Sequence, residues 1–182
     1  GRRGGPQSVR SWSLAADEAL HSGQNRRGGD LYTKAEDHQN AAHAYSEAGL
    51  DEEAAEAYLR AKMNREAAEA FLRCGKIERA AELISALGDH YQAGQVLLGL
   101  GRDEEALAEL QKVSYEQENY LDACDQVGLI FLRKGLLAMA VERYRMALAG
   151  RGLTDITRPL YFNLATALER AGKHASALHI YQ

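Results

Sequence analysis

A 13-residue repeat is the feature of this sequence that most constrains its fold. The repeating positions are Ala54, Ala55, Ala57, Tyr58 and Ala61, then Ala67, Ala68, Ala70, Phe71 and Cys74, then Ala80, Ala81, Leu83, Ile84 and Leu87. Thirteen residues turn an α-helix by roughly 1300°, so one continuous helix would carry successive copies of this apolar stripe about 140° apart. The repeat therefore predicts a helix that is interrupted once in every copy.

Glycines supply these interruptions. Gly49, Gly75, Gly88 and Gly101 stand at the ends of successive copies, and Lys62 takes the equivalent place once. Glycine readily adopts the left-handed conformation that closes a helix. Inside each copy the apolar positions share one helical face, and helices of about ten residues are only marginally stable alone in water. We therefore predict an all-α fold in which short helices stack on their neighbours.

The repeat also predicts a division of the chain. Residues 1–10 contain Gly, Pro and Arg and are predicted to be a flexible linker, and residues 11–114 an array of about eight short helical units. Residues 115–182 are predicted to form longer helix pairs, the last one truncated. Gly28 and Gly29 are poor helix formers, so their unit is either a looser turn or a helix that starts only at Asp30. Residues 114–119 are polar and form either an ordinary turn or a hinge.

Composition narrows the function classes. Charged residues make up 26% of the 182 residues, and no apolar run approaches the roughly 20 residues needed to span a bilayer. The acidic stretch from residue 30 to 116 argues against nucleic acid and against anionic membranes as partners.

Cys74 and Cys124 occupy apolar repeat positions, so we expect free thiols and a cytoplasmic protein. With no initiator Met, and a helical pattern still running at Gln182, we expect a fragment of a longer protein.

Catalytic and metal-binding constellations are not predicted. His38 and His43 are five residues apart, as are His174 and His179, which places the members of each pair on different helix faces. The acidic runs at residues 51–53 and 103–105 lie at helix starts, where they complement the helix dipole. We therefore expect no enzyme, no cofactor and no metal.

After Ser114 the spacing lengthens: Gly101 is followed by Gly135 after 34 residues and by Gly172 after 37 more. The pattern positions are Ala93, Gly94, Leu97, Ala106, Leu110 and Val113, then Gly128, Phe131, Ala140, Tyr144 and Ala147, then Tyr161, Leu164, Ala165, Leu168, Ala177 and Tyr181. Over residues 89–182 this resembles the tetratricopeptide repeat (TPR), a pair of helices in 34 residues. The helix-closing Pro of that family is absent. The 13-residue part resembles the compact helical-pair arrays of coatomer and intraflagellar-transport subunits.

The resemblance implies a right-handed α-solenoid of antiparallel helix pairs that acts as a non-catalytic interaction scaffold. In such folds the first helix of each pair lines a concave face that binds a peptide or a partner helix. The implied positions here are His90, Tyr91, Gln95, Leu98, Asp122, Asp125, Leu129, Leu132, Arg133, Phe162, Thr166, Glu169 and Arg170. The apolar members suggest the contact surface, so Leu132→Glu with Phe162→Glu is expected to abolish binding and leave helicity intact. Asp122 and Asp125 argue against peptides that end in a carboxylate.

An alternative is a regulatory or oligomerisation region of a larger enzyme or signalling protein, which contacts its own chain. Self-association through the end at Tyr181 would fit this alternative. For an acidic partner, the candidate cations are Arg133, Lys134, Arg170 and Lys173, although these side chains equally fit a solvated face.

Overall fold

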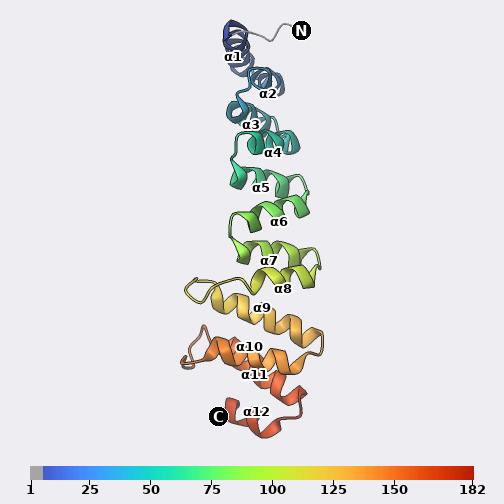
Figure 1. The fold of residues 1–182 in the computed structure, drawn as a ribbon, viewed down its shortest axis with the longest axis vertical. Helices are drawn as coiled ribbons and strands as arrows, with labels where there is room; N and C mark the ends of the chain where they lie inside the picture. The colour runs from blue at the N-terminus through green and yellow to red at the C-terminus, as the bar shows by residue number, and fades with distance from the viewer. Residues whose placement is uncertain (1–5) are drawn as a thin grey trace. The chain divides into compact units, whose positions relative to one another are not determined.

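The computed structural model describes residues 6–182, and every regular element in this range is an α-helix (Figure 1). The chain divides into two compact units, Gly1–Gly88 and Asp89–Gln182. The helices of the first unit are α1 (Pro6–His21), α2 (Asn25–Lys34), α3 (His38–Glu47), α4 (Asp51–Arg60), α5 (Asn64–Arg73) and α6 (Ile77–Ala86). The helices of the second are α7 (His90–Gly99), α8 (Asp103–Leu110), α9 (Tyr120–Arg133), α10 (Leu137–Leu148), α11 (Arg158–Arg170) and α12 (His174–Tyr181).

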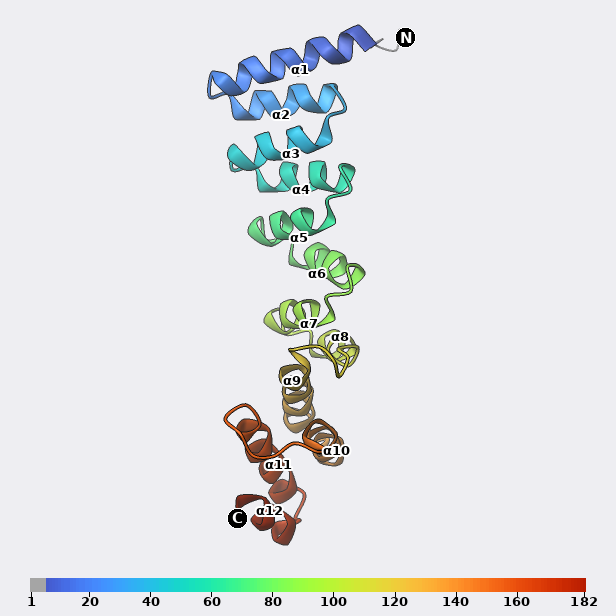
Figure 2. The ribbon, with the colours of Figure 1, turned by 90° about the vertical axis from the view of Figure 1, so that its left-hand side faces the viewer.

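In the first unit each helix packs against the next in antiparallel order, as Figure 2 shows for α1 to α4. The core is built from the repeated alanines and aromatic residues; Ala41, Ala54 and Ala67 have no exposed surface, and Phe71 is equally buried. Alanine lets helix axes approach closely, and the aromatic ring fills the space between layers. The predicted stacking of short antiparallel helices is confirmed.

The turns repeat as regularly as the helices. Residues with positive φ recur every 13 positions at Gly23, Glu36, Gly49, Lys62, Gly75, Gly88 and Gly101. At Gly49 the N–H donates to Ser46 O, and the N–H of Leu50 donates to Tyr45 O. These two bonds are the Schellman closure, which satisfies the last carbonyls of the helix and reverses the chain. Glu36 and Lys62 adopt the left-handed backbone conformation that glycine adopts at the other turns.

Replacing Lys62 with Gly is expected to stabilise the first unit by about 0.5–1 kcal/mol, because a side chain at φ 60° carries a steric cost that Gly lacks. The midpoint of urea unfolding measures the change. Lys34→Gly, inside α2, is the matched control and should lower the free energy of unfolding by about 1 kcal/mol. Equal effects at the two positions would contradict the left-handed assignment.

Gly28 and Gly29 lie inside α2, so the expectation of a loose turn or a start at Asp30 is wrong. A Cβ at Gly28 would lie 2.7 Å from Leu20 Cδ2, and one at Gly29 would lie 2.6 Å from Tyr45 Cε1. The two glycines let α1 and α3 pack directly onto the backbone of α2. Packing on both sides outweighs the low helix propensity of glycine, which costs only about 1 kcal/mol per residue.

The prediction of a flexible linker at residues 1–10 does not hold for residues 6–10. Residues 1–5 lie outside the described range, but α1 already begins at Pro6, so residues 6–10 are helical. Proline suits the first turn of a helix, where its missing N–H would have no partner within the helix.

Tyrosine hydroxyls connect neighbouring helices of the first unit, each to a residue 15 positions earlier. Tyr32 donates to the carboxylate of Asp17, and Tyr45 donates to Asp30 Oδ1 at 2.8 Å. The hydroxyl of Tyr58 lies 3.4 Å from His43 Nδ1. Burial, followed by the hydrogen bond to the Asp17 carboxylate, raises the pKa of Tyr32 to about 12. The folded protein therefore holds this proton more tightly than the unfolded chain does.

The raised pKa of Tyr32 predicts that the free energy of unfolding falls at alkaline pH. The stabilisation that Tyr32 contributes is fully present below the ordinary tyrosine pKa of about 10. It is lost as the pH rises through the pKa of about 12 that Tyr32 has in the folded protein. We expect the urea midpoint of the wild-type chain to fall between about pH 9 and pH 11 by more than that of Tyr32→Phe, which cannot ionise there. Equal falls would show that folding does not raise the pKa of Tyr32.

The second unit combines a short pair, α7 and α8, with longer helices from α9 onward. Its core contains Tyr144, Ile130, Leu168 and Val127, all essentially without exposed surface. Tyr144 packs against the backbone of α9 at Gly128, where a Cβ would come within 2.3 Å of the ring. Gly94 faces Leu110 in the same way, so small residues stand where the helices meet, as the repeat pattern predicts.

Residues 114–119 form the connection between α8 and α9. The N–H of Ser114 donates to Gln117 Oε1 at 3.0 Å, and the N–H of Gln117 donates to Ser114 O. Internal hydrogen bonds and the buried Val113 hold this connection in a defined conformation. It lies inside the second unit, whereas the first unit ends at Gly88. The division by repeat type at Ser114 therefore does not coincide with the division into compact units.

Candidate interaction surface

The predicted surface residues of the second unit lie on α7, α9 and α11, and α9 and α11 are in contact. Asp122, Arg133, Phe162, Glu169 and Arg170 are exposed. His90, Tyr91, Gln95, Leu98, Asp125, Leu129 and Thr166 are half-buried. These twelve positions all reach the surface.

Leu132 differs from the rest because it is buried, with 6% of its surface exposed, in the core formed by α9, α10 and α11. Leu129 is half-buried and packs on the same core. A charged residue at position 132 would therefore disturb the fold itself. The expectation that Leu132→Glu leaves helicity intact does not fit this position, and a binding test must use exposed positions.

Asp125 is engaged within the fold. Its Oδ1 accepts a hydrogen bond from Asn163 Nδ2 at 2.8 Å, which connects α9 with α11. Its backbone carbonyl accepts a bond from the hydroxyl of Tyr144 at 3.2 Å. Burial, followed by the nearby Asp125 carboxylate, raises the pKa of Tyr144. Asp125 thus fixes the spacing of the two helices that form the surface. Asn163 was not predicted; a polar residue next to Phe162 in the second turn of α11 is the only signal for it.

Ion pairs occupy several other polar positions. Arg133 Nη2 lies 2.9 Å from Asp103 Oδ2, and Lys134 pairs with Glu104. His90 Nδ1 lies 2.8 Å from Glu109 Oε2. These contacts connect α9 to α8 and α7 to α8, so Arg133 and His90 have partners within the chain.

The accessible part of the surface centres on α11. Phe162 is 61% exposed, and its ring meets that of Tyr181 edge to face at a centroid distance of 6.4 Å. Glu169 and Arg170 are exposed on the last turn of the same helix. Asp122 is exposed on the first turn of α9. An exposed aromatic ring is apolar surface that is suited to contact with another chain.

The described part of the chain contains no group of three His, Cys, Asp or Glu side chains placed to hold a metal ion. Both cysteines are free thiols; Cys124 is buried and Cys74 is half-buried. Among residues 6–182, no helix combines the length and the apolar character needed to cross a bilayer.

The architecture defines the class: the chain is a TPR-like α-solenoid. No protein-family model matches the sequence, and no curated protein matches it either. The solved structure of MamA (AMB-1) has a TM-score of 0.51 at 18% identity, over 89% of this chain and 88% of MamA. A Podosopora anserina protein described as a kinesin light chain with nearly identical TPR-like repeats has a TM-score of 0.48 at 16% identity, over 99% of this chain and 94% of that one. At these identities the likeness concerns the fold alone.

Proposed function

We propose that this chain is a non-catalytic interaction scaffold that binds a peptide or a partner helix on the exposed face of α9 and α11. The observation that carries this proposal is Phe162, a large aromatic side chain that is mostly exposed although it stands on a well-packed helix. Stacked helices present such side chains at fixed spacing, and aromatic anchors supply much of the binding energy of protein interfaces.

Exposed charges on the same two helices could form the polar rim of such an interface. Asp122 on α9 and Glu169 and Arg170 on α11 are exposed, while Asn163 and Asp125 fix the two helices beneath them. A central apolar contact with a charged rim is the usual anatomy of a reversible interface.

The alternative function is contact with the protein's own chain or with a second copy. Leu178 and Tyr181 of α12 are 58% and 49% exposed and extend the apolar surface beside Phe162. Sedimentation at several concentrations distinguishes the two, because a self-associating chain gains mass with concentration and a scaffold for another protein does not.

Phe162→Glu is expected to abolish capture of the partner in an affinity pull-down, because it replaces the apolar anchor with a charge at an exposed site that does not support the core. Met139→Glu is the matched control, since Met139 is 47% exposed and lies on α10. Partner capture that survives both substitutions would exclude the α9 and α11 face.

A further inference from the structure

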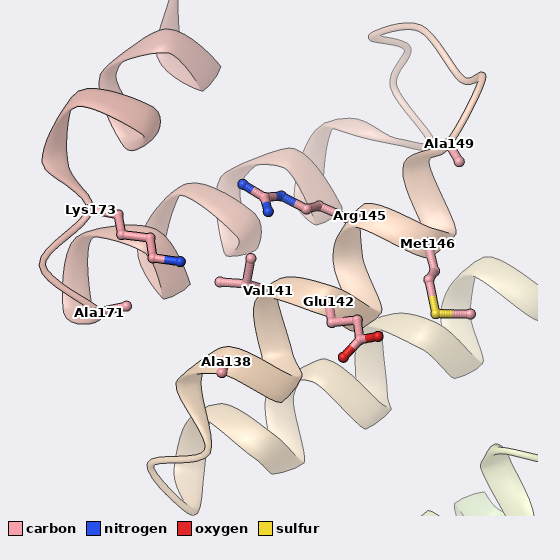
Figure 3. A pocket seen from close by; sticks show the side chains of 8 residues that line it. All are labelled: Ala138, Val141, Glu142, Arg145, Met146, Ala149, Ala171 and Lys173. Carbon is pink, nitrogen blue, oxygen red and sulfur yellow. The ribbon is translucent and has the colours of Figure 1, made fainter.

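A second surface lies on α10 and is lined by none of the residues proposed above. It is an open pocket of about 600 Å³ between the outer face of α10 and the turn that joins α11 to α12 (Figure 3). Its apolar part includes Val141 and Met146 of α10 and Ala171 of the turn. Pockets of this size accommodate several side chains of a bound segment.

Two cations face each other across this apolar floor. Figure 3 shows the guanidinium of Arg145 and the ammonium of Lys173 pointing toward one another over Val141, while the carboxylate of Glu142 points away from both. Within residues 6–182 neither Arg145 nor Lys173 has an ion-pair partner. Two converging, unpaired positive charges beside the apolar lining of a pocket are complementary to a group that is both anionic and apolar.

Two other cations of this unit have ion-pair partners. Arg133 and Lys134 pair with Asp103 and Glu104, which fastens α9 to α8. Of the four cations that the sequence suggests for an acidic partner, Lys173 is the one that lines the pocket, and Arg145 joins it there. α12 also begins directly after Lys173, so the positive end of its dipole adds to the local potential.

We propose that this pocket binds an acidic peptide segment that inserts an apolar side chain between Arg145 and Lys173. The apolar side chain contacts Val141, which lies between the two cations in Figure 3. Flanking carboxylates of the segment pair with the two cations. The pocket is open to solvent, so a segment of another chain can reach it. This proposal stands independently of the α9 and α11 face.

The test uses fluorescence anisotropy of a short labelled peptide with a central leucine flanked by glutamates, titrated with the full chain. We expect saturable binding that Arg145→Glu and Lys173→Glu each weaken by at least about tenfold, because each reversal turns a charge attraction into a repulsion. Arg158→Glu is the matched control: Arg158 is exposed on α11, pairs with Asp155, and lies outside the pocket. It should leave the affinity within about twofold, because rim charges outside a contact affect binding weakly.

Two further peptides separate the proposed partner from other ligands. A peptide with asparagine in place of leucine should bind at least about tenfold more weakly, because it lacks the apolar anchor. Equal binding of this peptide would mean that the pocket takes anions in general and would overturn the proposal. The proposal would also be overturned if the leucine peptide showed no saturable binding. It would be overturned as well if Arg158→Glu lowered the affinity as much as Arg145→Glu and Lys173→Glu do. Phe162→Glu should leave this binding unchanged, so failure here and failure of the proposed function can be told apart.

Discussion

Gly128→Val is expected to lower the free energy of unfolding of the second unit by about 3 kcal/mol, because the new side chain would overlap a packed aromatic ring. A Cβ at this position would lie 2.3 Å from Tyr144 Cζ. Tyr144 cannot withdraw, since it has no exposed surface and its hydroxyl is bonded to the carbonyl of Asp125. Either α9 and α10 must move apart or the tyrosine must leave the core.

Urea unfolding of the full chain, followed by circular dichroism, measures this change. Gly99→Val is the matched control, because Gly99 is also helical but nothing lies within 4 Å of the place its Cβ would occupy. We expect the control to change the free energy of unfolding by no more than about 0.5 kcal/mol. A loss at Gly128 that is no larger than at Gly99 would mean that the close contact with Tyr144 does not exist in solution.

Leu132→Glu is expected to cost about 4 kcal/mol, because it removes a buried leucine from the core and places a carboxylate there. Leu136→Glu offers the same chemical change four residues later, where the leucine is 43% exposed, and should change stability by no more than about 0.5 kcal/mol. Thermal unfolding of the two variants side by side measures the difference. Similar melting temperatures of the two variants would place Leu132 outside the core. If Leu132→Glu lowers the melting temperature, a loss of partner binding in that variant would report unfolding of the second unit.

The helices and turns could be predicted from the sequence because both depend on local pattern. The apolar stripe fixes which face of each helix is buried, and the residue at each thirteenth position fixes where the helix ends. Gly28 and Gly29 show the limit of such reasoning. Their low helix propensity is a local property, whereas their close contacts with Leu20 and Tyr45 come from helices on either side.

The interaction surface could be predicted only in part for a related reason. The repeat pattern places Phe162 and Leu132 on equivalent faces of their helices, yet Phe162 is mostly exposed and Leu132 is buried. Exposure depends on what lies next in the stack, and Leu132 packs in a core to which the neighbouring helices contribute. The pocket on α10 could not be predicted at all, because it depends on where the turn before α12 places Lys173 relative to Arg145.

The regular spacing of left-handed turns has a consequence for how such a chain can change in length. Each pair of turns, such as Gly49 to Gly75, returns the backbone to its original direction with the same helix faces buried. An in-frame duplication or deletion of one such pair would therefore join compatible surfaces on both sides. Loss of a single helix would instead reverse the direction of everything after it. The array can thus be inherited, expanded or shortened in whole helix pairs, without redesign of the residues that remain.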